Sequence, residues 1–436
     1  DFADTLSAAS GKNFTKTLKL PFFAPKGQPS TQRFSRNIAV ELSNRVNAIK
    51  ESPTLAITAK AGKLKAEGKD VIALAAGEPD FDTPQHIKDA AIEAINKGFT
   101  KYTPVSGTPG LKAAIVAKFK RDNGVEYKPS QILVSVGGKQ SFFNLCQAFI
   151  NPGDEVIVPA PYWVSYPDIV IIADGKPVIV ECGIEQGFKL TPAQLEAAIT
   201  PKTKMLVLNS PSNPTGAVYT LDELKALGAV LKKHPNILIA SDDMYEHVML
   251  GDTKFFNILN ACPELYDQTI LLNGVSKAYS MTGWRIGYAG GPEKLIKAME
   301  NVQSQSTSNP TSISQVAAEA ALNGSQDCIK PMLEAFNARQ KFVVDAFNAI
   351  PGLKCLVAGG AFYAFVDARD AIKRLAAAGT IPAASDLALG NYLLEQFMVA
   401  VVPGSAFGSE GYFRISFATS MQNLEKALAR IAEALA

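Results

Sequence analysis

Short apolar runs recur along the chain and alternate with longer stretches in which apolar positions return every three to four residues. The runs lie near residues 70, 132, 156, 178, 206, 238 and 270, and they are rich in Val, Ile and Leu. Such runs are typical of strands buried on both faces, and the stretches between them, such as residues 221–233, are typical of amphipathic helices. The alternation predicts α/β units around a mostly parallel sheet, with ligand-binding groups at the strand ends.

The pattern changes after Pro292. Residues 312–349 form one long helical tract, in which Pro331 is expected as a break or a kink. Four further apolar runs then suggest antiparallel strands, at residues 353–357, 361–366, 399–402 and 413–417. These elements predict a smaller α+β domain, to which helical stretches at residues 39–47 and 54–68 are expected to belong.

Composition and charge exclude several classes of partner. The 436 residues are 47% apolar and 19% charged, with a net charge of +2, as in a globular protein long enough for two domains. This charge gives no reason to expect a nucleic acid or an anionic membrane as partner, and no apolar run is long enough to span a bilayer. The five cysteines lack paired spacing and only three histidines exist, so no metal site is expected.

The first 36 residues differ in composition from the rest of the chain. They hold six basic residues against two acidic ones, together with eight Ser or Thr. Such a composition is typical of organelle transit segments, and it indicates a plastid location. The alternative is a flexible tail that carries no address.

Residues 274–287 carry the most specific chemistry of the chain. An apolar run at residues 269–272 leads to Lys277 among small residues, and Arg285 follows eight positions later with a glycine two positions away on each side. Partial burial and a nearby cation lower the pKa of a lysine, so that its amine can attack a carbonyl group. The planar guanidinium of an arginine suits phosphate oxygens. Together they offer what pyridoxal phosphate requires, although a surface lysine beside a structural arginine is the simpler interpretation.

Two further loops follow predicted strands and offer groups for such a cofactor. Gly137 and Gly138 lie between the run at residues 132–136 and a long helical stretch, where backbone N–H groups and the helix dipole favour a phosphate. Trp163 follows the run at residues 156–158, and it either packs in the core or stacks on a flat heterocycle.

Polar side chains at two more strand ends complete the candidate site. Asn213 lies in an Asn-Pro-Thr-Gly sequence, which is either a simple turn or a donor to the phenolic oxygen of pyridoxal and to a substrate carboxylate. Asp242 and Asp243 end a short apolar run, where an acid is often a helix cap. Pyridoxal chemistry, however, needs one carboxylate beside the pyridine nitrogen. Tyr245, close by, offers a hydrogen bond to the phenolic oxygen.

The complete pattern around Lys277, small-x-small-Lys followed by small-apolar-x-Gly-x-Arg-apolar-Gly, resembles the Schiff-base signature of class I aminotransferases. These are pyridoxal-phosphate enzymes of fold type I, and residues from about 40 to the C-terminus follow their motif order without a large gap. The resemblance implies that Lys277 forms the Schiff base and moves the substrate proton. It also selects Asp242 over Asp243 as the partner of the pyridine nitrogen, because the family spaces this acid three residues before the tyrosine.

Four more residues gain a role through the resemblance. In the family, the position of Gly77 lines the substrate pocket, and the aromatic ring at Trp163 stacks on the pyridine. The position of Arg414 binds the α-carboxylate, although an arginine in a strand more often points to solvent. The position of Tyr102 reaches the phosphate of the partner subunit, which implies a homodimer with shared active sites.

Within the family, the motifs are most similar to those of the 1β aspartate aminotransferases, which include bacterial enzymes and plastid enzymes that also transaminate prephenate. In that subgroup a threonine and a lysine, matched here by Thr54 and Lys139, handle the second carboxylate of the substrate. One position departs from the family. Many members have a phosphate-binding serine three residues before the lysine, where this chain has Gly274, and Ser276 or backbone N–H groups are the alternatives.

The resemblance therefore implies ping-pong transfer of an amino group between aspartate or glutamate and a keto acid: oxaloacetate, 2-oxoglutarate, or prephenate, which gives arogenate. The alternatives are a monocarboxylate or aromatic aminotransferase or a β-lyase on the same scaffold, and a catalytically silent pyridoxal-binding regulator. The implied α/β architecture has a large domain with a mostly parallel seven-stranded sheet and a small α+β domain. The expected boundaries are a tail at 1–36, the small domain at 37–86 and 331–436, and the large domain at 87–330.

Overall fold

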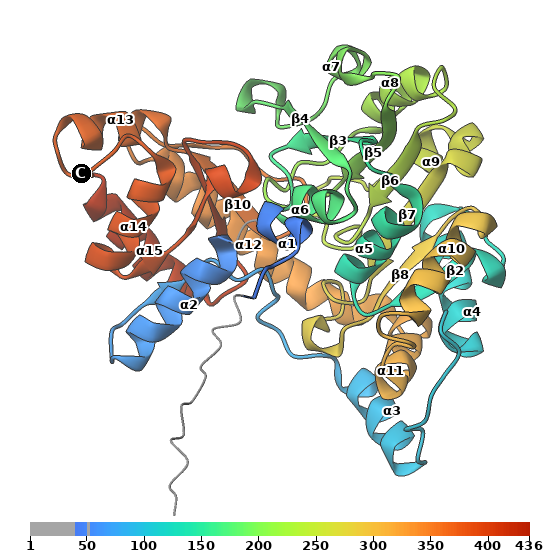
Figure 1. Cartoon of the computed structure of the whole chain (residues 1–436). Coiled ribbons are helices and arrows are strands. Elements are labelled where there is room, and N and C mark those ends of the chain that lie inside the picture. Colours follow the sequence, from blue (N-terminus) through green and yellow to red (C-terminus); the bar gives the residue numbers. More distant parts are fainter. Residues whose placement is uncertain (1–39, 50–52) are drawn as a thin grey trace, which may run out of the picture. The chain divides into compact units, whose positions relative to one another are not determined.

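The computed structural model describes residues 40–49 and 53–436 (Figure 1). The predicted basic tail at residues 1–36 lies outside the described residues. Residues 43–436 form one unit by their internal contacts. The finer division into a large domain at 87–330 and a small domain at 37–86 and 331–436 stays a prediction.

Seven strands form the main sheet, in the order β2-β8-β7-β6-β5-β3-β4. All neighbours are parallel except that β8 runs antiparallel to both β2 and β7. The predicted mostly parallel, seven-stranded sheet is thus confirmed. Its strands are β2 (Ile132–Ser135), β3 (Glu155–Ala160), β4 (Lys176–Glu181), β5 (Thr203–Asn209), β6 (Leu238–Asp242), β7 (Thr269–Gly274) and β8 (Gly287–Gly290).

The membership of this sheet differs from the prediction at one strand. The run near residue 70 forms β1 (Ile72–Ala73), which pairs with β11 (Val399–Ala400) in a separate two-stranded sheet. The seventh strand is instead β8, whose Gly-Tyr-Ala-Gly sequence contains no apolar run. Its glycines are required by close packing, because a Cβ on Gly287 would lie 2.3 Å from the backbone nitrogen of Gly138. The amino-acid composition of β8 therefore gives no indication that these residues form a strand.

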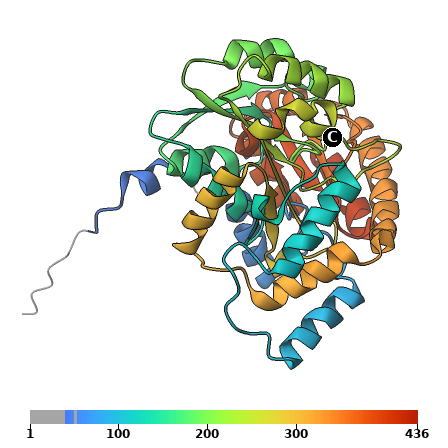
Figure 2. The same ribbon diagram turned by 90° about the vertical axis from the view of Figure 1, so that its right-hand side faces the viewer.

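Helices cover both faces of the main sheet (Figure 1). One face packs against α5 (Gly138–Phe149), α6 (Ser165–Ile172) and α10 (Glu293–Ser304), and the other against α4 (Pro109–Lys118), α8 (Leu221–Leu231) and α11 (Ser312–Asn323). The side chains of β3 alternate accordingly, since Val156 and Val158 belong to the first core and Ile157 to the second. Figure 2 shows α3 (Gln85–Asn96) lying alongside the orange α11.

Three of the four predicted antiparallel strands lie in a four-stranded sheet in the order β12-β13-β10-β9. The fourth run, at residues 399–402, divides: β11 pairs in parallel with β1, and only Val402 enters β12. Its strands are β9 (Lys354–Cys355), β10 (Tyr363–Asp367), β12 (Val402–Pro403) and β13 (Tyr412–Ser416). The preceding helical tract breaks at Gly324, where α11 ends, and not at Pro331. Pro331 lies in the first turn of α12 (Lys330–Asn348), where a missing N–H costs no hydrogen bond.

The remaining helices are α1 (Asn44–Ala48), α2 (Pro53–Ala66), α7 (Pro192–Ala198), α9 (Ile258–Ala261), α13 (Arg369–Ala377), α14 (Asp386–Phe397) and α15 (Met421–Ala434), with short 3₁₀ or π turns between elements. Helices α14 and α15 pack together, and α15 also packs on α12. Within the described residues, no helix has both the length and the apolar character needed to cross a membrane.

Candidate active site

A cleft of about 620 Å³ opens at the carboxyl ends of β5, β6 and β7 and is also bordered by β13. Parallel strands present their carboxyl ends at one edge of the sheet, so loops far apart in sequence meet there. The cleft is lined by ten of the predicted site residues: Gly77, Gly138, Lys139, Trp163, Asn213, Asp242, Tyr245, Lys277, Arg285 and Arg414.

Lys277 lies in this cleft with its amine enclosed by protein. Its Nζ donates a hydrogen bond to the carbonyl oxygen of Gly77 at 2.5 Å, and it lies 5.9 Å from the ring centroids of both Tyr245 and Phe362. Burial, reinforced by the positive charge of Arg414, lowers the pKa of Lys277 to about 8. Near neutral pH a useful fraction of this amine is therefore unprotonated, which a nucleophile requires.

The two adjacent aspartates at the end of β6 have different surroundings. Asp242 lines the cleft, where its Oδ2 accepts a hydrogen bond from the Tyr166 hydroxyl and its Oδ1 accepts one from the backbone N–H of Met244. Asp243 is 2% exposed and is bound by the side chains of Ser241 and Asn257, at 2.7 and 3.2 Å. Of the two acids, Asp242 alone lines the cleft.

Tyr166 is a site residue that the sequence did not reveal. Its ring is 1% exposed and packs edge-on against Phe142 and Trp163, with centroid distances of 4.9 and 5.2 Å. Burial raises the pKa of Asp242, and the hydrogen bond from Tyr166 opposes that rise by favouring the carboxylate. The one signal in the sequence was its position, because Tyr166 follows Trp163 by three residues, where the loop leads into α6.

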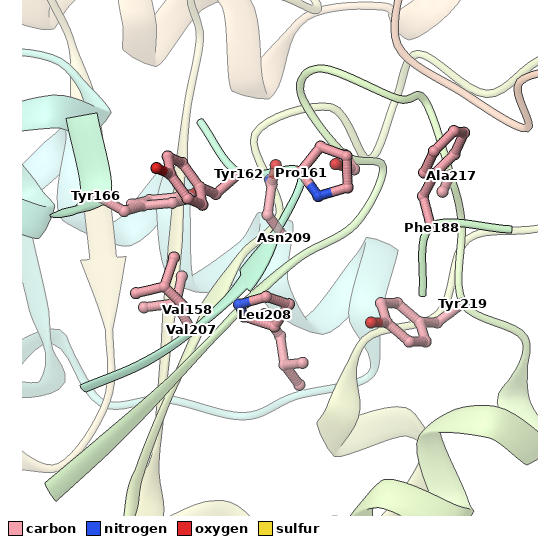
Figure 3. Close-up of a pocket in the computed structure, with 12 residues that line it drawn as sticks. Val158, Pro161, Tyr162, Tyr166, Phe188, Val207, Leu208, Asn209, Ala217 and Tyr219 are labelled. Carbon is pink, nitrogen blue, oxygen red and sulfur yellow. The ribbon is translucent and has the colours of Figure 1, made fainter. Parts of the chain in front are cut away.

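A second, much smaller cavity of about 20 Å³ lies beside the cleft (Figure 3). Tyr162, Tyr166 and Asn209 border both spaces. A volume of this size holds one water molecule and no substrate. The larger cleft is therefore the candidate site, and the small cavity belongs to the packing around Tyr166.

Arg414 is a buried cation that has no counter-ion in the part of the chain that the structure describes. It is 3% exposed, and its Nη1 and Nη2 donate to the side-chain oxygen of Asn213 and to the carbonyl oxygen of Ala75, at 2.8 and 2.7 Å. Its Nε has no hydrogen-bond partner, and no ion pair joins it to a carboxylate among the described residues. Burial lowers its pKa. A buried guanidinium in this state calls for an anionic ligand.

A second anion-binding arrangement lies at the start of α5. Gly137 has a φ of +84°, and a Cβ there would lie 2.2 Å from Nη2 of Arg285, so only glycine lets the guanidinium cover this turn. The exposed N–H groups of α5 and the Arg285 charge together suit a phosphate. At Gly274, a Cβ would approach the carbonyl oxygen of Ile286 to 3.0 Å, whereas Ser276 is buried and lines the cleft.

Lys139 and Trp163 form one wall of the cleft. The ammonium group of Lys139 lies 5.1 Å from the ring centroid of Trp163. Burial, together with the nearby charge of Arg285, lowers the pKa of Lys139. The cleft thus holds a compact positive charge in addition to the Arg414 guanidinium.

Tyr245 contacts a second tyrosine of the site, which the sequence did not single out. Its hydroxyl lies 2.8 Å from the hydroxyl of Tyr363, which comes from β10. The ring of Tyr363 also lies 4.4 Å from the Arg414 guanidinium, and a Cβ on Gly77 would lie 2.8 Å from its hydroxyl oxygen. Gly77 is therefore required by this close approach. Tyr363 was missed because it reads as one apolar residue in an apolar strand.

Three predicted site residues are not among those that the described structure places along this cleft. Gly137 adjoins it at the start of α5, where the Arg285 guanidinium covers the turn. Tyr102 is 90% exposed and does not line the cleft. Thr54 lies in α2, but its side chain is outside the described part of the structure. Their predicted roles, at a partner's phosphate and at a distal carboxylate, stay predictions.

Comparison with known proteins agrees with this geometry. Residues 69–431 match the sequence profile of the family described as aminotransferase class I and II. An aspartate/prephenate aminotransferase of Nitrosomonas europaea is 66% identical over 396 residues, covering 91% of this chain and 100% of that protein. The aspartate/prephenate aminotransferase of Cereibacter sphaeroides is 55% identical over 390 residues, covering 89% of this chain and 97% of that protein.

Solved structures are equally similar. The aspartate aminotransferase of Rhizobium meliloti matches with a TM-score of 0.86 at 50% identity, covering 91% of this chain and 99% of that one. The aspartate aminotransferase of Thermus thermophilus with maleate matches with a TM-score of 0.84 at 45% identity, covering 91% and 100%. The predicted fold is confirmed, and the chain belongs to the class I and II aminotransferase family.

Proposed function

We propose that the protein transfers an amino group between aspartate or glutamate and a keto acid, with prephenate as one acceptor. The observation that carries the proposal is one cleft that holds both the buried amine of Lys277 and the buried, unpaired guanidinium of Arg414. The first offers a nucleophile and the second an anchor for a carboxylate. Relatives that carry the name aspartate/prephenate aminotransferase support the choice of substrates.

The donor set fits pyridoxal phosphate as the cofactor. When bound, its ring accepts electrons that are released at the substrate α-carbon. Because Gly137 has no side chain, the Arg285 guanidinium lies directly against the turn at the start of α5, so that its charge adds to the backbone N–H groups there, as phosphate binding requires. The residues that would hold the group are Lys277 at the aldehyde, Arg285 and the Gly137–Gly138–Lys139 turn at the phosphate, Trp163 on the ring face, Asp242 at the pyridine nitrogen, and Tyr245 and Asn213 at the phenolic oxygen.

Three side chains of the protein would bind the substrate, transfer its proton and hold the cofactor ring. Arg414 binds the substrate α-carboxylate and thereby orients the α-carbon. Lys277, whose pKa is lowered to about 8, takes the proton from that carbon and later returns it, because a base with this pKa changes protonation state readily near neutral pH. Hydrogen bonds from Tyr166 and Met244 favour the carboxylate form of Asp242 against the burial that raises its pKa, and a carboxylate there would hold a proton on a ring nitrogen.

The alternative functions differ from the proposed one in turnover or in their use of the cleft. A silent pyridoxal-binding regulator would bind the cofactor through Lys277 as well, and its lack of turnover distinguishes it from an enzyme. A monocarboxylate aminotransferase or a β-lyase has no use for Lys139 as a second cation in the cleft. Steady-state rates with oxaloacetate, prephenate and phenylpyruvate as acceptors separate these functions. Activity with phenylpyruvate alone would contradict the proposal.

Lys139→Ala is expected to lower kcat/KM for aspartate and prephenate. The activation free energy should rise by about 1.5–3 kcal/mol, the value of one charge-assisted contact. Phenylpyruvate lacks a distal carboxylate and should lose less. Lys204→Ala is a matched control, because Lys204 lies 5.1 Å from the Phe149 ring but does not line the cleft. The cofactor occupancy of each variant must also be measured, since Lys139 belongs to the turn that would bind the phosphate. Equal losses on all three substrates at full occupancy would mean that Lys139 does not bind the distal carboxylate.

We further propose a homodimer in which Tyr102 completes the partner's site. Tyr102 is 90% exposed, and Ile92, Ile95 and Phe99 on and after α3 are also exposed apolar residues, as a contact surface requires. When Lys277→Ala and Tyr102→Ala subunits are refolded together, the mixture should be more active than the summed activities of the two separate variants. The reason is that one of the two sites in a mixed dimer has both native residues. No gain on mixing, or a fully active monomer in sedimentation at assay concentration, would contradict shared sites.

The plastid location rests on the basic composition of residues 1–36 alone. These residues lie outside the described part of the structure, and the relatives named above are bacterial proteins. That location therefore has no support beyond composition and stays a prediction.

A further inference from the structure

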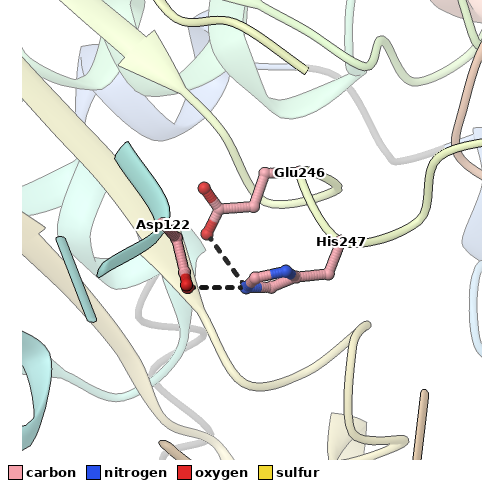
Figure 4. Close-up of side chains that lie close together, drawn as sticks. All are labelled: Asp122, Glu246 and His247. Atoms are coloured by element: carbon pink, nitrogen blue, oxygen red, sulfur yellow. Dashed lines mark ion pairs between the residues drawn. The ribbon is translucent and has the colours of Figure 1, made fainter. Parts of the chain in front are cut away.

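Outside the cleft, three side chains form a compact ionisable cluster: Asp122, Glu246 and His247 (Figure 4). The histidine Nε2 lies 3.3 Å from an Asp122 oxygen and 3.4 Å from a Glu246 oxygen. Their ligand atoms lie within 4.8 Å of one another, as metal ligands do.

Protein cations already occupy this cluster. The ammonium of Lys118, which is fully buried, forms an ion pair with Glu246, and Arg121 donates to both carboxylate oxygens of Asp122 at 2.6 and 3.0 Å. Burial raises the pKa of Glu246, but Lys118 and His247 outweigh burial and leave it lowered, so Glu246 is ionised. Two carboxylates thus face two protein cations, which leaves no net negative charge for a metal ion.

The cluster instead joins two segments that carry the catalytic groups. Glu246 directly follows Tyr245 at the end of the segment that begins with Asp242. Its Oε1 accepts a hydrogen bond at 2.7 Å from the side chain of Asn273, which lies four residues before Lys277. The Asn273 side-chain oxygen in turn accepts the backbone N–H of Gly274 at 2.7 Å. One carboxylate therefore fixes both segments.

Helix α4 holds that carboxylate in place from the other side. Lys118 is the last residue of α4, and its Nζ also donates to the side-chain oxygen of Asn123 at 2.8 Å. Asn123 donates to Glu246 Oε2, again at 2.8 Å. Both oxygens of the Glu246 carboxylate thus have a buried donor, and a buried carboxylate held in this way favours one geometry.

We propose that Glu246, held by Lys118, is a positioning residue that sets the distance between the Asp242–Tyr245 segment and the Lys277 loop. This inference rests on the proposed function of Lys277. Displacing a catalytic group by about 1 Å can cost about a hundredfold in rate without removing any group that binds substrate. Loss of the network should therefore lower kcat far more than it raises KM.

The test uses the holoenzyme with Lys118→Met/Glu246→Met, since methionine matches the unbranched stems and removes both charges together. We expect kcat to fall about tenfold to a hundredfold, KM for aspartate to change less than about threefold, and the pH midpoint of the bound cofactor's absorption to shift. The control is Lys176→Met/Glu155→Met. That pair, 3.0 Å apart, also includes a buried glutamate, but it lies at the amino ends of β3 and β4.

The control pair is expected to lower Tm alone, with kcat and the absorption midpoint unchanged. Wild-type kcat and midpoint in Lys118→Met/Glu246→Met, at full cofactor occupancy, would overturn the proposal and leave the network a role in stability only. If that variant does not fold, Asn273→Ala decides, because it keeps the ion pair and removes the link to Gly274. It should lower kcat about tenfold, and an unchanged kcat would overturn the proposal. Failure of the proposed function is a separate result, namely a wild-type protein that shows no lysine-bound cofactor.

Discussion

Lys277→Ala is expected to abolish multiple-turnover transamination, with a loss of at least about 10⁴-fold in kcat. The substitution removes both the nucleophile for the cofactor aldehyde and the base at the substrate α-carbon, and the base alone contributes about 10²–10⁴-fold. The measurement is steady-state amino transfer from aspartate to 2-oxoglutarate. Arg285, Lys139 and Asp242 are unchanged in this variant, so the protein should still bind pyridoxal phosphate without a covalent bond.

Two comparisons make this prediction specific to Lys277. Lys139→Ala, which removes the other lysine of the cleft, should retain turnover on aspartate within about a hundredfold of wild type. Small primary amines added to Lys277→Ala should restore part of the rate, because they replace the missing base. A fully active Lys277→Ala enzyme would contradict the account of the site.

Asp242→Asn is expected to slow proton removal at the substrate α-carbon far more than it weakens cofactor binding. The binding loss should be about 1.5–3 kcal/mol, the value of one charge-assisted hydrogen bond. The rate loss should exceed that value, because a neutral amide cannot keep the pyridine nitrogen protonated. The measurements are the cofactor dissociation constant and the primary isotope effect with α-deuterated aspartate, which should increase as proton removal becomes rate-limiting.

Asp243→Asn is the matched control, since it changes the adjacent carboxylate in the same strand end. Asp243 is bound by Ser241 and Asn257 and does not line the cleft, so its substitution should lower stability and leave the isotope effect unchanged. The reverse pattern, with a slowed step in Asp243→Asn alone, would show that the wrong acid had been chosen.

The parts of the site that the sequence predicted are those encoded by short, ordered motifs. Gly137-Gly138-Lys139, the Lys277–Arg285 segment and the acid before Tyr245 each follow a buried apolar run, and parallel topology brings such strand ends together. The fold was predictable for the same reason, since short runs rich in Val, Ile and Leu are typical of strands buried on both faces. Strand β8 was missed because its closely packed glycines carry no such pattern.

The residues that the sequence did not predict act across long separations in the chain. Tyr166 lies 76 positions before its partner Asp242, and Lys118, the last residue of α4, pairs with Glu246 in the turn that follows β6. Each of these residues lies in an ordinary helical or turn pattern, so burial and partner are visible only in the folded chain. Arg414 is the intermediate case. A strand arginine usually faces solvent, and the family resemblance alone assigned it to a carboxylate; its burial without a counter-ion among the described residues supports that assignment.

The most direct test of the central claim is to identify the lysine that carries the cofactor. The purified holoenzyme is reduced with borohydride and digested, and the pyridoxyl-labelled peptide is located by mass spectrometry. We predict one label per subunit, on Lys277. Lys139 is the informative competitor, because it lines the same cleft and its pKa is also lowered by burial. A label on Lys139, or no labelled peptide from a fully loaded enzyme, would contradict the account.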